Sequence, residues 1–85
     1  MKCVLTRLKS THSKLRTDVI EGNTEELPKL GNSFYLIAKG LAEGTTRYVS
    51  TTPVNKISPD GPNSMIFETK NTTYKLEYYE PKEFN

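Results

Sequence analysis

The chain has 85 residues, of which 34% are hydrophobic and 26% charged, with twelve Lys and Arg against ten Asp and Glu. This length supports one domain, which we assign to residues 1–80, with residues 81–85 as a short C-terminal tail. One Cys and one His exclude the usual Cys/His zinc site, and a net charge of +2 is too small to indicate nucleic-acid binding by itself. No apolar run reaches the roughly 18 residues of a membrane helix or forms a signal peptide, so we expect a cytoplasmic protein with no membrane partner.

Short strands are the elements that the sequence predicts. Eleven threonines and five tyrosines favour strands over helices, and no window has the apolar spacing of a helix. Alternation and turn residues predict six strands, at residues 2–9, 16–24, 33–39, 47–54, 65–69 and 73–79. Strands at this regular spacing predict an all-β fold, a small antiparallel β-barrel of about five to six strands that is SH3-like or OB-like. Closure of the barrel would remove exposed sheet edges.

In two of the predicted strands, the alternation of residues indicates which side chains are buried. In the first strand, Cys3 lies mid-strand, and we interpret it as a small buried hydrophobe rather than a nucleophile. In the strand at 33–39, Tyr35 and Ile37 alternate with further apolar residues, so both of its faces are apolar. We therefore expect this strand to be covered on both sides.

Two reversals divide the second half of the chain. Residues 58–63 read Ser-Pro-Asp-Gly-Pro-Asn and predict a turn. Residues 70–72 predict a tight hairpin with Asn71 in a left-handed backbone conformation. The last strand alternates cleanly, which predicts that Tyr74 and Tyr78 point into the core with their hydroxyls at its rim.

The loop after the first strand is the polar cluster with the strongest indication of a ligand. Hydroxyls, a histidine and two cations can together hold a phosphate. A solvated loop whose hydroxyls cap its own backbone explains the same residues, and we favour that interpretation. The candidates for an anion or phosphate site are Ser10, Thr11, His12, Ser13, Lys14 and Arg16.

Exposed tyrosines next to basic residues form a second candidate site. Tyr35, Tyr48 and Tyr79 alternate with the expected core residues, and Arg47 precedes one of them. Such residues either stack on single-stranded nucleic acid or form a protein interface. No glycine-rich phosphate loop and no nucleophile–base motif occurs, so we expect neither an enzyme nor a cofactor.

Two segments carry a resemblance to a known group of proteins. Residues 47–54 read RYVSTTPV and residues 67–76 read FETKNTTYKL, which gives T-(S/T)-P-V followed by F-x-T-x-N-(S/T)-x-Y-x-L. This pattern resembles small, mostly uncharacterised β-barrel proteins of tailed bacteriophages and prophages. The resemblance extends over about residues 5–76 and implies a phage protein that acts in the infected cell. Such proteins often inhibit a host enzyme or an antiviral defence, and the pattern assigns no functional residue.

The sequence therefore predicts a non-enzymatic binding module that docks on a host bacterial protein, with an inhibitory role as one outcome. Two alternatives stay open. One is a nucleic-acid-binding barrel that combines the exposed tyrosines with basic residues. The other is a homo-oligomeric barrel that sequesters a phosphorylated nucleotide in the loop at 10–17. The basic residues of the first alternative are Arg7, Lys9, Lys14, Arg16 and Arg47.

Overall fold

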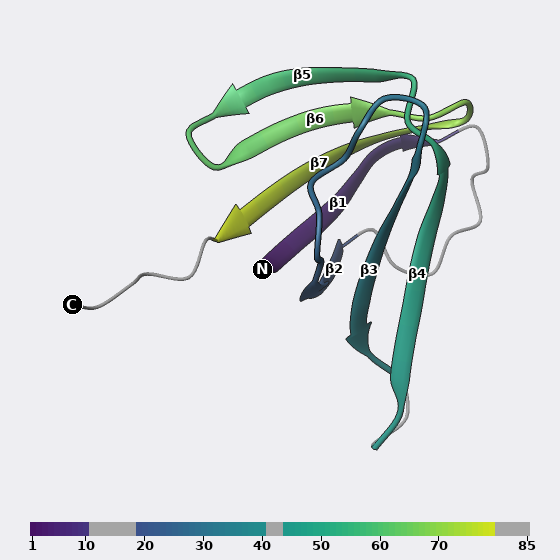
Figure 1. The fold of residues 1–85 in the computed structure, drawn as a ribbon, viewed down its shortest axis with the longest axis vertical. Coiled ribbons are helices and arrows are strands. Elements are labelled where there is room, and N and C mark those ends of the chain that lie inside the picture. The colour runs from purple at the N-terminus through teal and green to yellow at the C-terminus, as the bar shows by residue number, and fades with distance from the viewer. Residues whose placement is uncertain (11–18, 41–43, 80–85) are drawn as a thin grey trace.

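A single antiparallel sheet of seven strands forms the fold, in the order β4-β3-β2-β1-β7-β6-β5 (Figure 1). The structure is a computed structural model that describes residues 1–10, 19–40 and 44–79, with the side chain of Ser10 left out. Strands β1 to β4 pair in sequence order, strands β5 to β7 do the same, and β1 pairs with β7 to join the two series. The strands are β1 (Lys2–Ser10), β2 (Val19–Asn23), β3 (Ser33–Lys39), β4 (Thr46–Pro53), β5 (Lys56–Gly61), β6 (Ser64–Glu68) and β7 (Thr72–Tyr79).

The sheet is bent without closing into a barrel. Figure 1 shows β3 and β4 running steeply across the direction of β5, β6 and β7. Strands β4 and β5 follow each other through two residues, yet no ladder joins them in the described part of the chain. The all-β antiparallel class is therefore confirmed, barrel closure is not found, and an SH3-like or OB-like arrangement stays a prediction.

The backbone at the corner between β4 and β5 bonds to the connection between β2 and β3. Val54 N donates to Asn32 O at 2.9 Å, and Val54 O accepts from Gly31 N at 2.8 Å. These bonds belong to an isolated parallel bridge between Leu30 and Val54. Because the connection from β2 to β3 occupies the backbone groups of Val54, they do not extend a ladder toward β5.

The second half of the chain departs from the sequence prediction in two places. The predicted reversal is present but shorter, because residues 58–61 continue β5 and the turn lies at 62–63. Pro59 fits this strand because β5 is an edge of the sheet, where a missing N–H costs no ladder bond. The predicted left-handed Asn71 is also wrong, since no described residue other than glycine has a positive φ. Thr69 N donates to Thr72 O at 2.9 Å and closes the hairpin without it.

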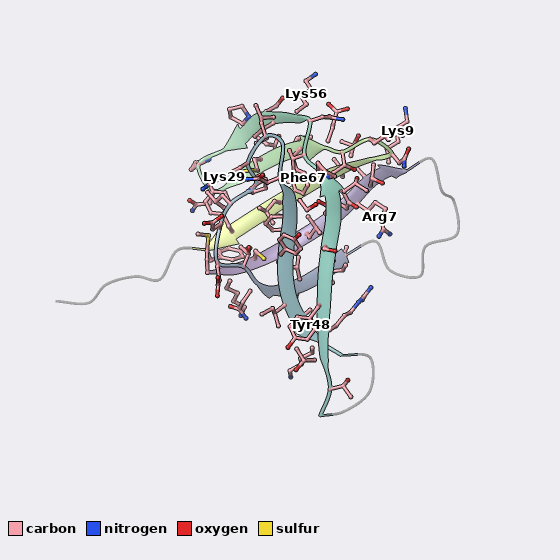
Figure 2. The ribbon with its side chains drawn as sticks, turned by 45° about the vertical axis from the view of Figure 1, so that its right-hand side comes forward. Arg7, Lys9, Lys29, Tyr48, Lys56 and Phe67 are labelled. Atoms are coloured by element: carbon pink, nitrogen blue, oxygen red, sulfur yellow. The ribbon has the colours of Figure 1, made fainter. Side chains whose placement is uncertain are left out.

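One face of the sheet, here called the inner face, holds the core. The Phe67 ring lies 5.5 Å from the Phe34 ring and 5.0 Å from the Tyr74 ring, centroid to centroid (Figure 2). Tyr74 and Tyr78 pack against the buried residues, as the alternation predicted. The buried apolar residues are Cys3, Leu5, Ile20, Phe34, Leu36, Ala38, Val54, Phe67 and Leu76. The opposite surface is called the outer face.

Gly22 brings β2 and β3 together at the middle of the sheet. It pairs with Ala38, and a Cβ on Gly22 would collide with Ile37 O and lie 2.9 Å from Leu36 Cδ1. The structure shows a strand residue whose lack of a side chain allows close backbone approach.

Candidate functional site

Three exposed aromatic and aliphatic side chains gather on the outer face of β3 and β4. Tyr35 is 65% exposed, Ile37 47% and Tyr48 79%. Ile37 lies directly opposite Tyr48 and Tyr35 opposite Ser50, so all three belong to one face because paired residues share a face. We call Tyr35, Ile37 and Tyr48 the β3–β4 patch. Figure 2 shows Tyr48 over the ribbons of these two strands.

The patch corrects the expectation that β3 is covered on both sides. Residues of β3 alternate strictly between buried and exposed along the strand. Phe34, Leu36 and Ala38 fill the core, whereas Tyr35 and Ile37 remain exposed. The apolar residues on the outer face therefore do not serve the core of this chain.

A buried threonine fixes the register that places Tyr48 outward. The pairing of β3 with β4 shifts between Ser33 and Tyr35, where β4 contains an extra residue. Thr51 lies at this bulge, 8% exposed, and its Oγ1 accepts a hydrogen bond from Phe34 N at 3.0 Å. The same hydroxyl donates to Thr52 O at 2.7 Å. Because a slip of one residue exchanges the two faces of a strand, this bond helps determine which side chains reach solvent.

The connection between β2 and β3 borders the patch and forms a groove of about 500 Å³ with it. The Thr24 hydroxyl lies 2.8 Å from Tyr35 O and 2.9 Å from Glu26 O, which ties the start of the connection to β3. Pro28 is buried and Leu27 packs against the core, so the connection is anchored in its middle. The residues lining the groove include the patch itself and the charged side chains Glu25, Glu26 and Lys29.

The charges beside the groove are of both signs. Lys29 Nζ lies 3.7 Å from Glu26 Oε2, and both side chains are mostly exposed. An exposed pair of this kind contributes little to stability. The rim of the groove is therefore polar and adaptable, while its floor is aromatic and aliphatic.

The structure brings together only part of the site predicted from the sequence. Tyr35 and Tyr48 share the outer face, whereas Tyr79 is 51% exposed on β7, three strands away from β3 in the sheet. Arg47 pairs with Ala38 and lies on the inner face, half-buried. Of the anion-binding candidates, Thr11, His12, Ser13, Lys14 and Arg16 lie outside the described residues, and Ser10 ends β1. That site stays a prediction.

Sequence reasoning missed Ile37 and the groove as parts of the site. The signal for Ile37 was present, because it has the same parity as Tyr35 on a strand with a complete alternating pattern. The groove had no such signal, since it depends on how the connection at 24–32 folds back onto β3.

Cys3 is fully buried on the inner face, as predicted. Burial raises the pKa of its thiol above the ordinary value, against a smaller opposing effect of the nearby N-terminal charge. A protonated, inaccessible thiol is a poor nucleophile. Among the described residues, no three His, Cys, Asp or Glu side chains are grouped so as to hold a metal ion, and no helix is long and apolar enough to cross a membrane.

Comparison with known proteins adds no family. Neither protein-family models, nor curated proteins, nor solved structures give a significant match to this chain. A function must therefore be argued from the residues and their arrangement. The β3–β4 patch and the groove beside it are the features of the described chain that best fit a binding site.

Proposed function

We propose that this chain is a non-enzymatic binding module that docks on a partner protein through the β3–β4 patch. The observation that supports the proposal is an exposed cluster of two tyrosines and an isoleucine next to a groove with a charged rim. Interface centres are enriched in aromatic residues, and their rims are polar. Tyrosine suits such a surface because its ring is apolar while its hydroxyl stays hydrogen-bonded to water when no partner is present.

The class of partner that we propose is a bacterial host protein. This part of the proposal is based on the resemblance to small phage proteins, carried by residues 47–54 and 67–76. It includes action in the cytoplasm of the infected cell and inhibition of a host or antiviral-defence enzyme. A compact, SH3-like or OB-like domain would suit this role, since such domains bind through their surfaces rather than through deep catalytic pockets.

Protein binding is favoured over nucleic-acid binding by where the cations lie. Arg7 pairs with Tyr74 and Arg47 with Ala38, so both belong to the inner face, away from the exposed tyrosines. On the outer face, Lys56 lies 3.7 Å from Glu68 and Lys75 lies 3.5 Å from Asp60. Single-strand binding needs a continuous basic track beside the stacking rings. Among the described residues, Lys29 and Lys39 lie near the rings, but Lys29 is paired with Glu26, and two separate lysines do not make a continuous track.

The test is affinity capture from a bacterial lysate with matched variants. We expect the wild-type chain to retain a stoichiometric protein that survives nuclease treatment, and the double variant Tyr35→Ser with Tyr48→Ser to lose it. The control is Tyr79→Ser, an equally conservative change at an exposed tyrosine outside the patch, which should retain the protein. Loss of the captured material on nuclease treatment would favour the nucleic-acid alternative. Equal capture by the double variant would exclude the patch as the docking site.

A further inference from the structure

We propose that β4 is a self-association edge, through which two copies of this chain pair antiparallel around a two-fold axis and extend the sheet. The proposal concerns an edge of the sheet rather than the patch on its face. It does not depend on the proposed partner protein. It rests on a difference between the two edge strands and on the charge pattern of β4.

The two edges of the sheet are β4 and β5 (Figure 1). Strand β5 carries three features that block strand addition: Pro59, a register shift between Pro59 and Gly61, and charged residues at Lys56 and Asp60. Proline has no N–H to donate, and bulges and charges at an edge discourage pairing with another strand. An additional strand at β5 would meet an interrupted series of donors.

Strand β4 lacks these features along most of its length. It runs for eight residues, Thr46–Pro53, with its only proline at the last position and Arg47 as its only charged residue. Among the described strands it pairs with β3 alone. Threonine, valine and tyrosine dominate its sequence, and these residues favour strands. Its own register shift lies at Thr51, near the C-terminal end, so residues 46–50 form a regular and nearly uncharged edge, which is a template for another strand.

The charge pattern of β4 indicates that a second copy fits this edge. Two registers keep the inner and outer faces continuous over residues 48–52 and centre the axis on the strand, with Val49 opposite Val49 or Ser50 opposite Ser50. In these registers the two Arg47 residues lie four or six residues apart along the ladder, about 13 or 20 Å at roughly 3.4 Å per residue. Both separations exceed the screening length of about 8 Å at physiological salt, so the pairing brings no like charges together.

The side chains of β4 also match themselves. Val49 is half-buried and packs against the core from its edge position, so a second Val49 or Thr51 across the axis would cover it. On the outer face, Tyr48 would lie opposite Ser50 or Thr52 of the other copy, and small hydroxyl residues leave room for its ring. The axis would place two copies of the β3–β4 patch side by side on one continuous face.

Sedimentation and light scattering of purified protein test the proposal, with Ser50→Lys and Ser50→Glu as the variants. Ser50 is exposed on the outer face, so both changes are compatible with folding, which circular dichroism verifies. In either register, the two copies of position 50 are direct or diagonal neighbours across the axis. We expect wild type at micromolar concentration to have twice the monomer mass of 9.6 kDa, and each variant to raise the dimer dissociation constant by about tenfold.

Mixing the two variants separates charge repulsion from general damage. Opposite charges at position 50 should restore the dimer, and native mass spectrometry should detect it as a heterodimer. Ser58→Lys, the matched change on the outer face of β5, should leave the wild-type dimer intact. A wild-type chain that stays monomeric up to millimolar concentration would overturn the proposal. So would a dimer that tolerates Ser50→Lys, which would place the contact elsewhere.

Discussion

The outer face of the sheet differs between its two halves. Over β5, β6 and β7 it carries ion pairs beside Ile66 and Tyr79, with Lys56 near Glu68 and with Asp60 shared between Lys75 and the Ser64 hydroxyl. Over β3 and β4 it presents Tyr35, Ile37 and Tyr48, the β3–β4 patch. Both halves cover the same core with their inner faces, so the difference is not required for folding. The proposed function assigns the β3–β4 half to contact with a partner and leaves the other half to solvent.

One core unites the two halves of the sheet, and Phe67→Ala tests this with the largest expected effect on stability. Phe67 is fully buried on β6 and its ring contacts Phe34 of β3. Removing a buried phenylalanine ring costs about 3–5 kcal/mol. We expect the free energy of unfolding in urea to fall by this amount, whether unfolding is followed by a probe in one half of the sheet or in the other. The control Ile66→Ala, on the outer face of the same strand, should cost about 1 kcal/mol. Separate transitions for the halves would contradict a shared core.

Gly22→Ala tests the joint between the halves. The added Cβ would collide with Ile37 O of β3, and overpacking of this kind costs about 1–3 kcal/mol. Because the clash lies where β2 meets β3, hydrogen exchange should accelerate in β3 and β4 more than in β5 and β6. The neighbouring exposed residue supplies the control, since Asn23→Ala adds no atom near β3. Uniform acceleration in all strands would show that the joint has no local role.

Thr51→Val tests what sets the orientation of the patch. The change keeps the shape of the side chain but removes the hydroxyl that accepts from Phe34 N at 3.0 Å. A buried donor left without its partner costs about 1–3 kcal/mol. The exposed neighbour makes a matched comparison, because Thr52→Val changes a hydroxyl that solvent can replace. The measurement is the free energy of unfolding in urea. Equal losses of this free energy for the two variants would mean that the Thr51 bond does not stabilise the bulge.

The sequence anticipated the alternating faces of the strands better than their connections. Cys3, Leu36 and Tyr74 lie where a period of two places them, because burial on one face leaves a local signal. The predicted barrel closure was not found, and the sequence carries no local signal that the corner at Val54 bonds to residues 31 and 32. Pro59 was placed in a turn for a related reason. A proline is typical both of a turn and of an edge strand, and only the sheet topology distinguishes the two.

A smaller effect, limited to alkaline pH, is expected at Cys3, on the strand that joins the two halves. Burial raises the pKa of this thiol above its ordinary value of 9.0. The folded state therefore favours the protonated thiol, and this contribution is complete below pH 9 and is lost as pH rises through the folded pKa. Cys3→Ala should lower the overall stability by leaving a cavity but flatten its decline above pH 9. An unchanged slope would show that the decline above pH 9 does not come from Cys3.

The smallest effects on stability are expected for residues on the two halves of the outer face. These residues test whether the halves differ in function. Asp60→Asn removes a partly exposed ion pair, and Tyr48→Ser removes a ring that is 79% exposed. Each should change the free energy of unfolding by only about 0.5 kcal/mol. The effect of Asp60→Asn should vanish at high salt, because salt screens the ion pair. Binding should separate them: Asp60→Asn should retain the captured partner, whereas Tyr48→Ser should weaken it, because truncating an aromatic residue at an interface centre costs 2 kcal/mol or more on the usual scale. If both variants bind alike, the exposed tyrosines are ordinary surface residues and the two halves of the sheet do not differ in function.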